Sequence, residues 1–156
     1  MNLYLALRAL HVVGATVLFG TGAGIAFFML MAHRTADAKL IAHTAGVVVV
    51  ADFVFTATAV VLQPITGAAL ALIAGEPMFQ GWIAASLALY LFAGVCWLPV
   101  VWIQLRLRDL ARDAAAAGSD LPAAYHHLWR IWVALGVPAF AAVAAIIWLM
   151  TAKPTF

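Results

Sequence analysis

The sequence carries little charge for its length. Charged residues make up 9% of its 156 residues, whereas about a quarter of the residues in a soluble domain are charged. Hydrophobic residues make up 67%, and the mean hydropathy is +1.09. This composition excludes a soluble protein and indicates an integral membrane protein. The net charge of +2 is explained by basic loops beside membrane spans, so no nucleic-acid partner is expected.

Cysteine is nearly absent, because the chain has only Cys96. A single cysteine excludes a disulfide framework and leaves no Cys-x-x-Cys-His motif for covalent attachment of haem. Any haem would therefore be held non-covalently. The first apolar run is too long for a signal peptide and lacks a charged leader, so we expect it to be retained as the first helix.

Long apolar runs fill most of the chain. About 20 apolar residues cross a bilayer, and uninterrupted runs of this length indicate helices, because the strands of a barrel are shorter and alternate. The sequence therefore predicts an all-α fold, in which residues 1–156 form one bundle of four transmembrane helices. The expected spans are about 3–32, 40–74, 82–112 and 123–152.

The basic residues predict the orientation of the bundle. They are concentrated in or beside the first and third loops, at Arg34, Lys39, Arg106, Arg108 and Arg112, whereas Arg8 and Lys153 lie at the opposite ends of the spans. By the positive-inside rule, the first and third loops are cytoplasmic and both termini lie on the outer side.

One histidine differs from the others in its depth. His33, His43, His126 and His127 lie near the predicted cytoplasmic ends of their spans, whereas His11 lies in the outer half of the first span. A polar side chain in a lipid-crossing helix is costly without a partner, so His11 is a candidate functional residue. A rise of about 1.5 Å per residue places it level with 62–63 in the second span.

The helical face of His11 also carries small residues, among them Gly14 and Gly22. Small residues allow two membrane helices to pack closely. A flat macrocycle such as haem needs a similar groove, so both interpretations of these glycines remain open.

The second span has a polar face. Asp52, Thr56, Gln63 and Thr66 lie within about 40° of one line, which predicts that this face points into the bundle. A carboxyl group in the membrane must be protonated, paired or hydrated. Arg130 in the fourth span is the nearest basic candidate, so Asp52 is either its structural partner or a group that handles protons.

Two further histidines offer an alternative metal site. His43 could join His126 or His127 as a pair of ligands near the cytoplasmic ends. However, His43 lies about 180° from Asp52 on its helix and so points away from the polar interior, which weakens this alternative.

The third span carries Tyr90, Trp97, Gln104 and Arg108 at heptad-like spacing. Aromatic stripes of this kind are typical of a bundle core or of an interfacial belt. Pro64, Pro99 and Pro138 fall inside the last three spans, where we expect them to curve the helices.

Four segments carry a resemblance to known families. They are Leu7-Arg8-Ala9-Leu10-His11, His33-Arg34, Gln63-Pro64-x-Thr66-Gly67 and Trp148-Leu149-Met150-x-Ala152-Lys153-Pro154. On these segments the chain resembles, over essentially its full length, a bacterial four-helix integral membrane family of unknown function. That family is distantly similar to HemJ-type protoporphyrinogen oxidases and to copper-resistance D membrane domains, which share a Lys/Arg-Ala-Leu-His opening of the first helix.

The resemblance implies a role for one residue and a location for the protein. In the HemJ type the first-helix histidine is implicated in binding b-type haem, and the match carries this role to His11. The chain departs from that type at Ser86, near where its third helix has a basic residue, and at Leu135-Gly136, where it has Asn-Glu before Val-Pro. The resemblance therefore implies non-covalent haem b in the bacterial cytoplasmic (inner) membrane, without implying protoporphyrinogen oxidation.

Three function classes remain open. The first is a haem protein that transfers electrons or acts as an oxidoreductase, with a quinone or another lipid-soluble substrate as partner, and with homo-oligomers as an open question. In this class, Arg8 is expected to neutralise a haem propionate or, alternatively, to reach lipid phosphates. The second is a proton- or metal-coupled transporter lined by the polar face of the second span. The third is a non-catalytic membrane subunit. The absence of symmetry between the two halves favours the first and third classes.

Overall fold

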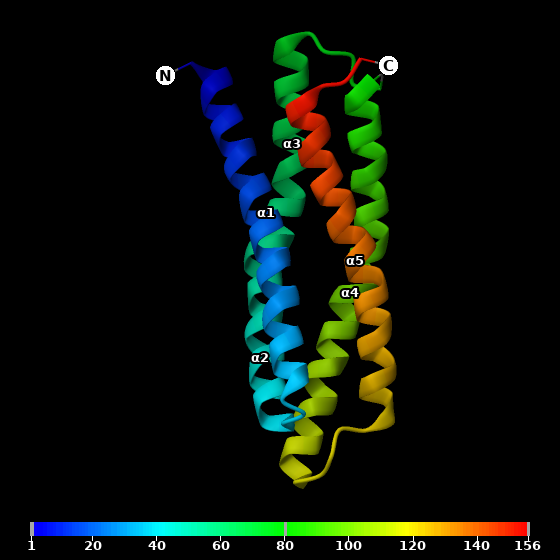
Figure 1. Cartoon of the computed structure of the whole chain (residues 1–156). Helices are drawn as coiled ribbons and strands as arrows, with labels where there is room; N and C mark the ends of the chain where they lie inside the picture. The colour runs from blue at the N-terminus through cyan, green and yellow to red at the C-terminus, as the bar shows by residue number, and fades with distance from the viewer. Residues whose placement is uncertain (1, 80, 156) are drawn as a thin grey trace.

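Helices joined by short turns make up the computed structural model, which describes residues 2–79 and 81–155 (Figure 1). In these residues the elements are α1 (Leu3–Arg34), α2 (Ala38–Ala51), the π-helical segment η1 (Asp52–Thr56), α3 (Ala57–Ala74), α4 (Gly81–Ala117) and α5 (Ala123–Ala152). The segments α2, η1 and α3 form one continuous helix. The described chain thus has 4 helices that are long and apolar enough to cross a membrane, and the predicted four-helix all-α fold is confirmed.

Short polar residues and glycines set the ends of the helices. The side chain of Asn2 accepts a hydrogen bond from the backbone N–H of Tyr4 at the start of α1. Asp37 caps α2 in the same way, accepting from the backbone N–H groups of Lys39 and Leu40. Gly75 ends α3 with a φ of 70°, a left-handed conformation that a residue without a Cβ adopts at little cost.

The predicted spans match the helices except at the ends near the first and third loops. α1, α2 and α4 extend past the predicted limits, and α4 does so most, because it continues through 113–117 to Ala117. This last segment contains four consecutive alanines, and alanine has the highest helix propensity. The polar residues that signalled the end of the span therefore mark where α4 leaves the hydrocarbon, while the helix itself continues.

The second membrane helix contains a π turn, which the sequence analysis did not predict. The backbone N–H of Ala57 donates to the carbonyl of Asp52, five residues earlier. Asp52 and Thr56, the first and last residues of the turn, are both buried. π turns within α-helices are frequent at functional sites, and this one begins at a buried carboxyl group.

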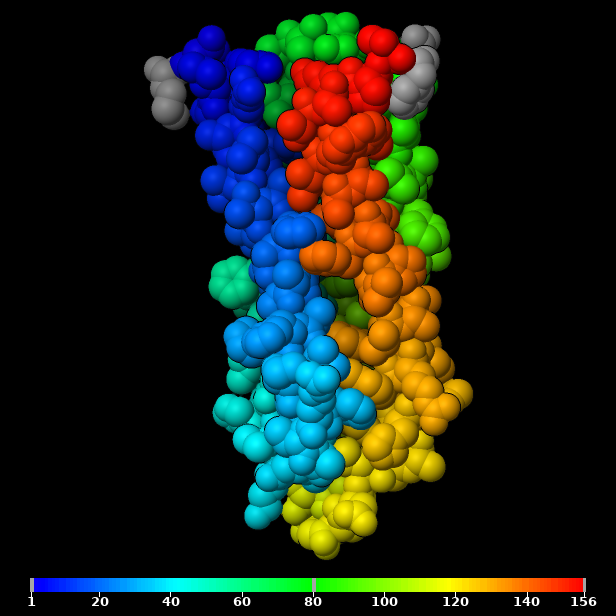
Figure 2. All heavy atoms as spheres, viewed as in Figure 1, coloured from blue at the N-terminus to red at the C-terminus, as the bar shows by residue number. Residues whose placement is uncertain are grey.

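A buried hydrophobic cluster lies in the half of the bundle that contains the first and third loops. It joins the end of α1, the start of α2, the second half of α4 and the start of α5, and includes Met29, Ile41, Leu107 and Tyr125. In the other half fewer residues are buried, among them Thr66, Ser86 and Ala93. Figure 2 shows a recess between α1 and α5 on this face of the molecule. His11 therefore lies in the less tightly packed half.

Candidate functional site

The polar residues of the second membrane helix and of α1 meet at His11. Nδ1 of His11 lies 2.8 Å from the hydroxyl oxygen of Thr66 on α3. Nε2 of Gln63, one turn earlier on α3, donates to the backbone carbonyl of His11 at 3.0 Å. The structure thus places His11 level with the neighbourhood of Gln63, as the residue count from the helix ends predicted.

The hydrogen bonds of Thr66 determine which nitrogen of His11 carries the proton. The Thr66 hydroxyl donates to the backbone carbonyl of Leu62 at 2.8 Å, so its single proton is already used. It therefore accepts from His11, which assigns the proton to Nδ1 and leaves a lone pair on Nε2. This arrangement of a neutral, oriented imidazole is the one that metal-binding histidines use.

The contact between α1 and α3 depends on two glycines. A Cβ at Gly67 would lie 3.2 Å from Cε1 of His11, and a Cβ at Gly14 would collide with the side-chain amide of Gln63. Gly22 faces a different helix, because a Cβ there would lie 3.7 Å from the ring of Phe140 on α5. In this structure Gly14 and Gly22 both serve helix packing, so a role for them in holding a macrocycle stays a prediction.

Asp52 is buried but does not pair with Arg130. Its side chain is 4% exposed, and its carboxyl oxygen Oδ1 accepts a hydrogen bond of 3.4 Å from the indole N–H of Trp97 on α4. Arg130 is exposed, and in the described ranges the ion pair is between Arg108 and Asp109. The Asp52–Arg130 pair, one of the two alternatives for Asp52, is therefore not formed among the residues described. α5 turns its aromatic residues inward and directs Arg130 outward, where the long side chain keeps its charge hydrated.

The stripe on α4 faces this polar interior. The hydroxyl of Tyr90 donates to the backbone carbonyl of Val60, Trp97 donates to Asp52, and Gln104 accepts from the indole N–H of Trp132 at 3.1 Å. The heptad spacing signalled this inward face, although it did not identify the partners. Two buried polar atoms have no hydrogen-bond partner among the described residues, namely Oγ1 of Thr56 and Nε2 of Gln104.

Comparison with known protein families agrees with the membrane fold. The chain matches the family described as "Predicted integral membrane protein (DUF2269)" over residues 5–154, nearly its whole length. It belongs to the DUF2269 family. No curated protein and no solved structure matches it. Membership establishes an integral, multi-pass membrane protein in contact with a lipid bilayer, and the similarity to HemJ and copper-resistance D proteins stays an inference from the quoted motifs.

The structure gives the other predicted residues of this DUF2269 chain separate surroundings. Arg8 is exposed near the N-terminal start of α1. Its contact with a haem propionate stays a prediction. His43 is exposed on the face of α2 opposite Asp52. His126 on α5 lies beside His33, with 6.1 Å between the ring centroids. A joint site of His43 and His126 stays a prediction.

An aromatic cluster at the loop end was not predicted. His33 stacks on Trp129 with ring centroids 4.1 Å apart, and its Nδ1 lies 3.3 Å from the hydroxyl of Tyr125. Trp129 in turn stacks on Trp132 at 5.2 Å. The spacing of Tyr125, Trp129 and Trp132 on one helical face was a signal for this cluster, because residues three and four apart lie side by side.

Across residues 2–79 and 81–155, no three His, Cys, Asp or Glu side chains gather to hold a metal ion. A metal held by protein ligands alone therefore receives no support from the geometry. A haem iron needs one or two axial protein ligands, since the macrocycle supplies the remaining four. His11 meets that smaller requirement through its Nδ1 contact with Thr66.

Proposed function

We propose that this membrane protein binds a b-type haem through His11 and takes part in electron transfer. The observation that carries the proposal is the hydrogen bond of 2.8 Å between Nδ1 of His11 and Thr66. This bond leaves Nε2 available as a ligand atom, and second-shell bonds of this kind orient the histidine ligands of metals. The HemJ-like Arg-Ala-Leu-His motif at 8–11 supports the same assignment.

The residues around His11 fit an axial ligand better than they fit a haem groove. The imidazole is half-buried and hydrogen-bonded between α1 and α3. The space above Gly14 is already taken by Gln63, and the space above Gly22 by Phe140. The proposal therefore depends on His11 and its support from α3.

The chain's own residues prepare the ligand before anything binds. Thr66 holds the imidazole in one tautomer and one orientation, and Gln63 fixes the backbone of α1 at the same residue. A bound haem would supply one-electron chemistry at this level of the bilayer, and a lipid-soluble quinone is the partner that we propose for it.

The test is the visible absorption spectrum of the protein purified in detergent after incubation with haemin. We expect the wild-type protein to show a Soret band that shifts on reduction with dithionite, and we expect His11→Ala to lose or strongly shift it. His43→Ala is the matched control, because His43 is exposed on the face of α2 opposite Asp52. This variant should keep the wild-type spectrum. Equal spectra for wild type and His11→Ala, both folded by circular dichroism, would remove His11 from the proposal.

A further inference from the structure

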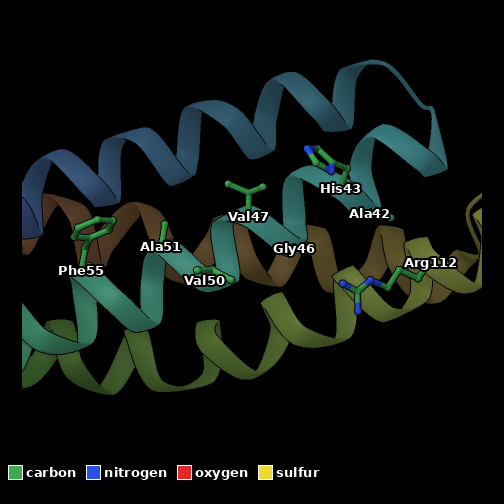
Figure 3. A pocket seen from close by; sticks show the side chains of 8 residues that line it. All are labelled: Ala42, His43, Gly46, Val47, Val50, Ala51, Phe55 and Arg112. Atoms are coloured by element: carbon green, nitrogen blue, oxygen red, sulfur yellow. The ribbon is translucent and has the colours of Figure 1, made fainter.

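A groove runs along the outside of the bundle, on the far side of the second membrane helix from its polar face. Its volume is about 570 Å³, and seven of its eight lining residues come from α2 and η1, while the eighth is Arg112 of α4 (Figure 3). Along most of its length the groove is apolar. Val47, Val50 and Phe55 contribute to its wall, and each of them is more than half exposed.

The two charged or ionisable side chains of the groove are at the same end. Figure 3 shows His43 and Arg112 at the end nearer the first loop, whereas Phe55 lies at the other end. The side chain of Arg112 extends from α4 toward Gly46, where a Cβ would lie 3.6 Å from its guanidinium nitrogen Nη2. The missing side chain at Gly46 therefore lets a cationic group lie against the backbone of α2.

Arg112 has no ion pair among the residues that the structure describes. Asp109, three residues before Arg112, forms an ion pair of 2.8 Å with Arg108. Asp113, the next residue after Arg112, is exposed. The guanidinium of Arg112 is thus an available cation at the mouth of an apolar groove. A guanidinium binds the oxygens of a phosphate through two parallel hydrogen bonds.

The length of the groove matches one leaflet of a bilayer. His43 and Phe55 are 12 residues apart in the sequence, which corresponds to about 18 Å at 1.5 Å per residue. The hydrocarbon core of a bilayer is about 30 Å thick, or about 15 Å per leaflet. His43 is the sixth residue of α2, so the polar end of the groove lies near the membrane surface and the apolar end near its midplane.

We infer that this groove binds one phospholipid with an anionic head group. Its phosphate would bind Arg112 beside His43, and one acyl chain would lie along Val47, Val50 and Phe55. Net negative charge on the lipid complements the positive end of the groove. A basic residue near the membrane surface favours an anionic lipid by an amount equivalent to about a fivefold change in affinity. This inference does not depend on haem binding.

Native mass spectrometry of the detergent-solubilised protein measures the binding directly. Phosphatidylglycerol and phosphatidylcholine with identical acyl chains are the two probes. We expect the wild-type protein to bind phosphatidylglycerol several-fold more tightly, and Arg112→Gln to reduce this preference by about fivefold. Arg106→Gln is the matched control, because Arg106 is exposed on the same helix but does not line the groove, and it should keep the wild-type preference.

A second variant fills the groove beside Arg112. Gly46→Leu places a side chain in the groove where glycine leaves space, so it should weaken the binding of both lipids while the protein remains folded. Equal affinities of the wild-type protein for the two lipids would overturn the inference, as would equal effects of Arg112→Gln and Arg106→Gln. Full competition by millimolar inorganic phosphate would identify an anion site in place of a lipid site. A dimer abolished by Gly46→Leu would assign the groove to a second copy of the chain.

Discussion

The imidazole of His11 has its hydrogen-bond partner on a neighbouring helix, and this contact links α1 to α3. Polar side chains inside a membrane are stable only when such partners exist. Thr66 is itself bonded to the backbone carbonyls of Leu62 and Gln63, so its position is set by α3 alone. The orientation of His11 is therefore imposed on it by the second membrane helix.

Thr66→Val should release His11 while nearly preserving the volume of the side chain. Hydrogen bonds between membrane helices contribute about 0.6 kcal/mol on average, and we expect a loss of thermal stability of about this size. The spectrum of the haem-loaded protein should also shift, because the imidazole loses its fixed tautomer. Thr58→Val is the control, since Thr58 is exposed and bonds only to the backbone carbonyl of Val54. Identical stability and spectra for the two variants would contradict the positioning role of Thr66.

Asp52 and Arg130 should behave as independent residues. Because Arg130 is exposed and Asp52 is bound by Trp97, the double-mutant cycle of Asp52→Asn and Arg130→Gln should be additive within about 0.5 kcal/mol. Chemical denaturation in mixed micelles measures the free energy of unfolding of each variant, and a larger coupling energy would be evidence for the ion pair.

A proton-handling role of Asp52 is a separate proposal. An unchanged pH dependence of the haem reduction potential in Asp52→Asn would exclude this role.

At the scale of the elements, α1 and α3 approach each other where glycines face polar side chains. The backbone carbonyl of His11 accepts from Gln63, and the imidazole lies against Gly67. Close approach of this kind strengthens both packing and hydrogen bonding between membrane helices. The π turn of η1 lies on the same helix as Gln63 and Gly67, about two to four α-helical turns earlier in the chain, by about 3.6 residues per turn.

A larger residue at Gly67 should separate these two helices. A Cβ there already lies 3.2 Å from the His11 ring, so Gly67→Val should force the imidazole to move and destabilise the fold by about 1–3 kcal/mol. Gly94→Ala is the control on α4, because a Cβ at Gly94 meets nothing within 4 Å. Alanine in a helix is favoured over glycine, so this control should be neutral or stabilising. A thermal melt in detergent measures the melting temperature of each variant. Equal melting temperatures for Gly67→Val and Gly94→Ala would contradict the close contact between α1 and α3.

At the scale of the whole molecule, the bundle is more tightly packed at its loop end than at its terminal end. The buried aromatic and aliphatic cluster lies near the first and third loops, whereas His11 lies in the other half, toward the N-terminal start of α1, where fewer residues are buried. A rigid loop end joined to a looser terminal end suits a protein that admits a ligand beside α1. Both chain ends lie at the same end of the bundle (Figure 1), as an even number of spans requires.

The positive-inside rule predicts that this shared end faces away from the cytoplasm. In a Cys96→Ala background, Ser119→Cys in the third loop should react with a membrane-impermeant maleimide only after the cells are opened. Thr155→Cys at the other end should react in intact cells. Both residues are exposed, so failure to label reports orientation and not burial. The reverse pattern would show that the termini are cytoplasmic.

The sequence alone determined the number of helices, their limits to within a few residues, and the inward polar face of the second span. These features depend on hydropathy and on helical period, which are local properties of the chain. The level of His11 opposite Gln63 also followed from the constant rise of a helix.

Only the tertiary structure decided which side chains meet between helices. Trp97 takes the place expected of Arg130 beside Asp52, and Gln63 fills the space above Gly14. The rotation of each helix relative to its neighbours results from the packing of all four helices together, with the aromatic face of α5 turned inward. The π turn at Asp52–Thr56 then changes the rotation within one helix. Neither effect is visible in the pattern of a single helix.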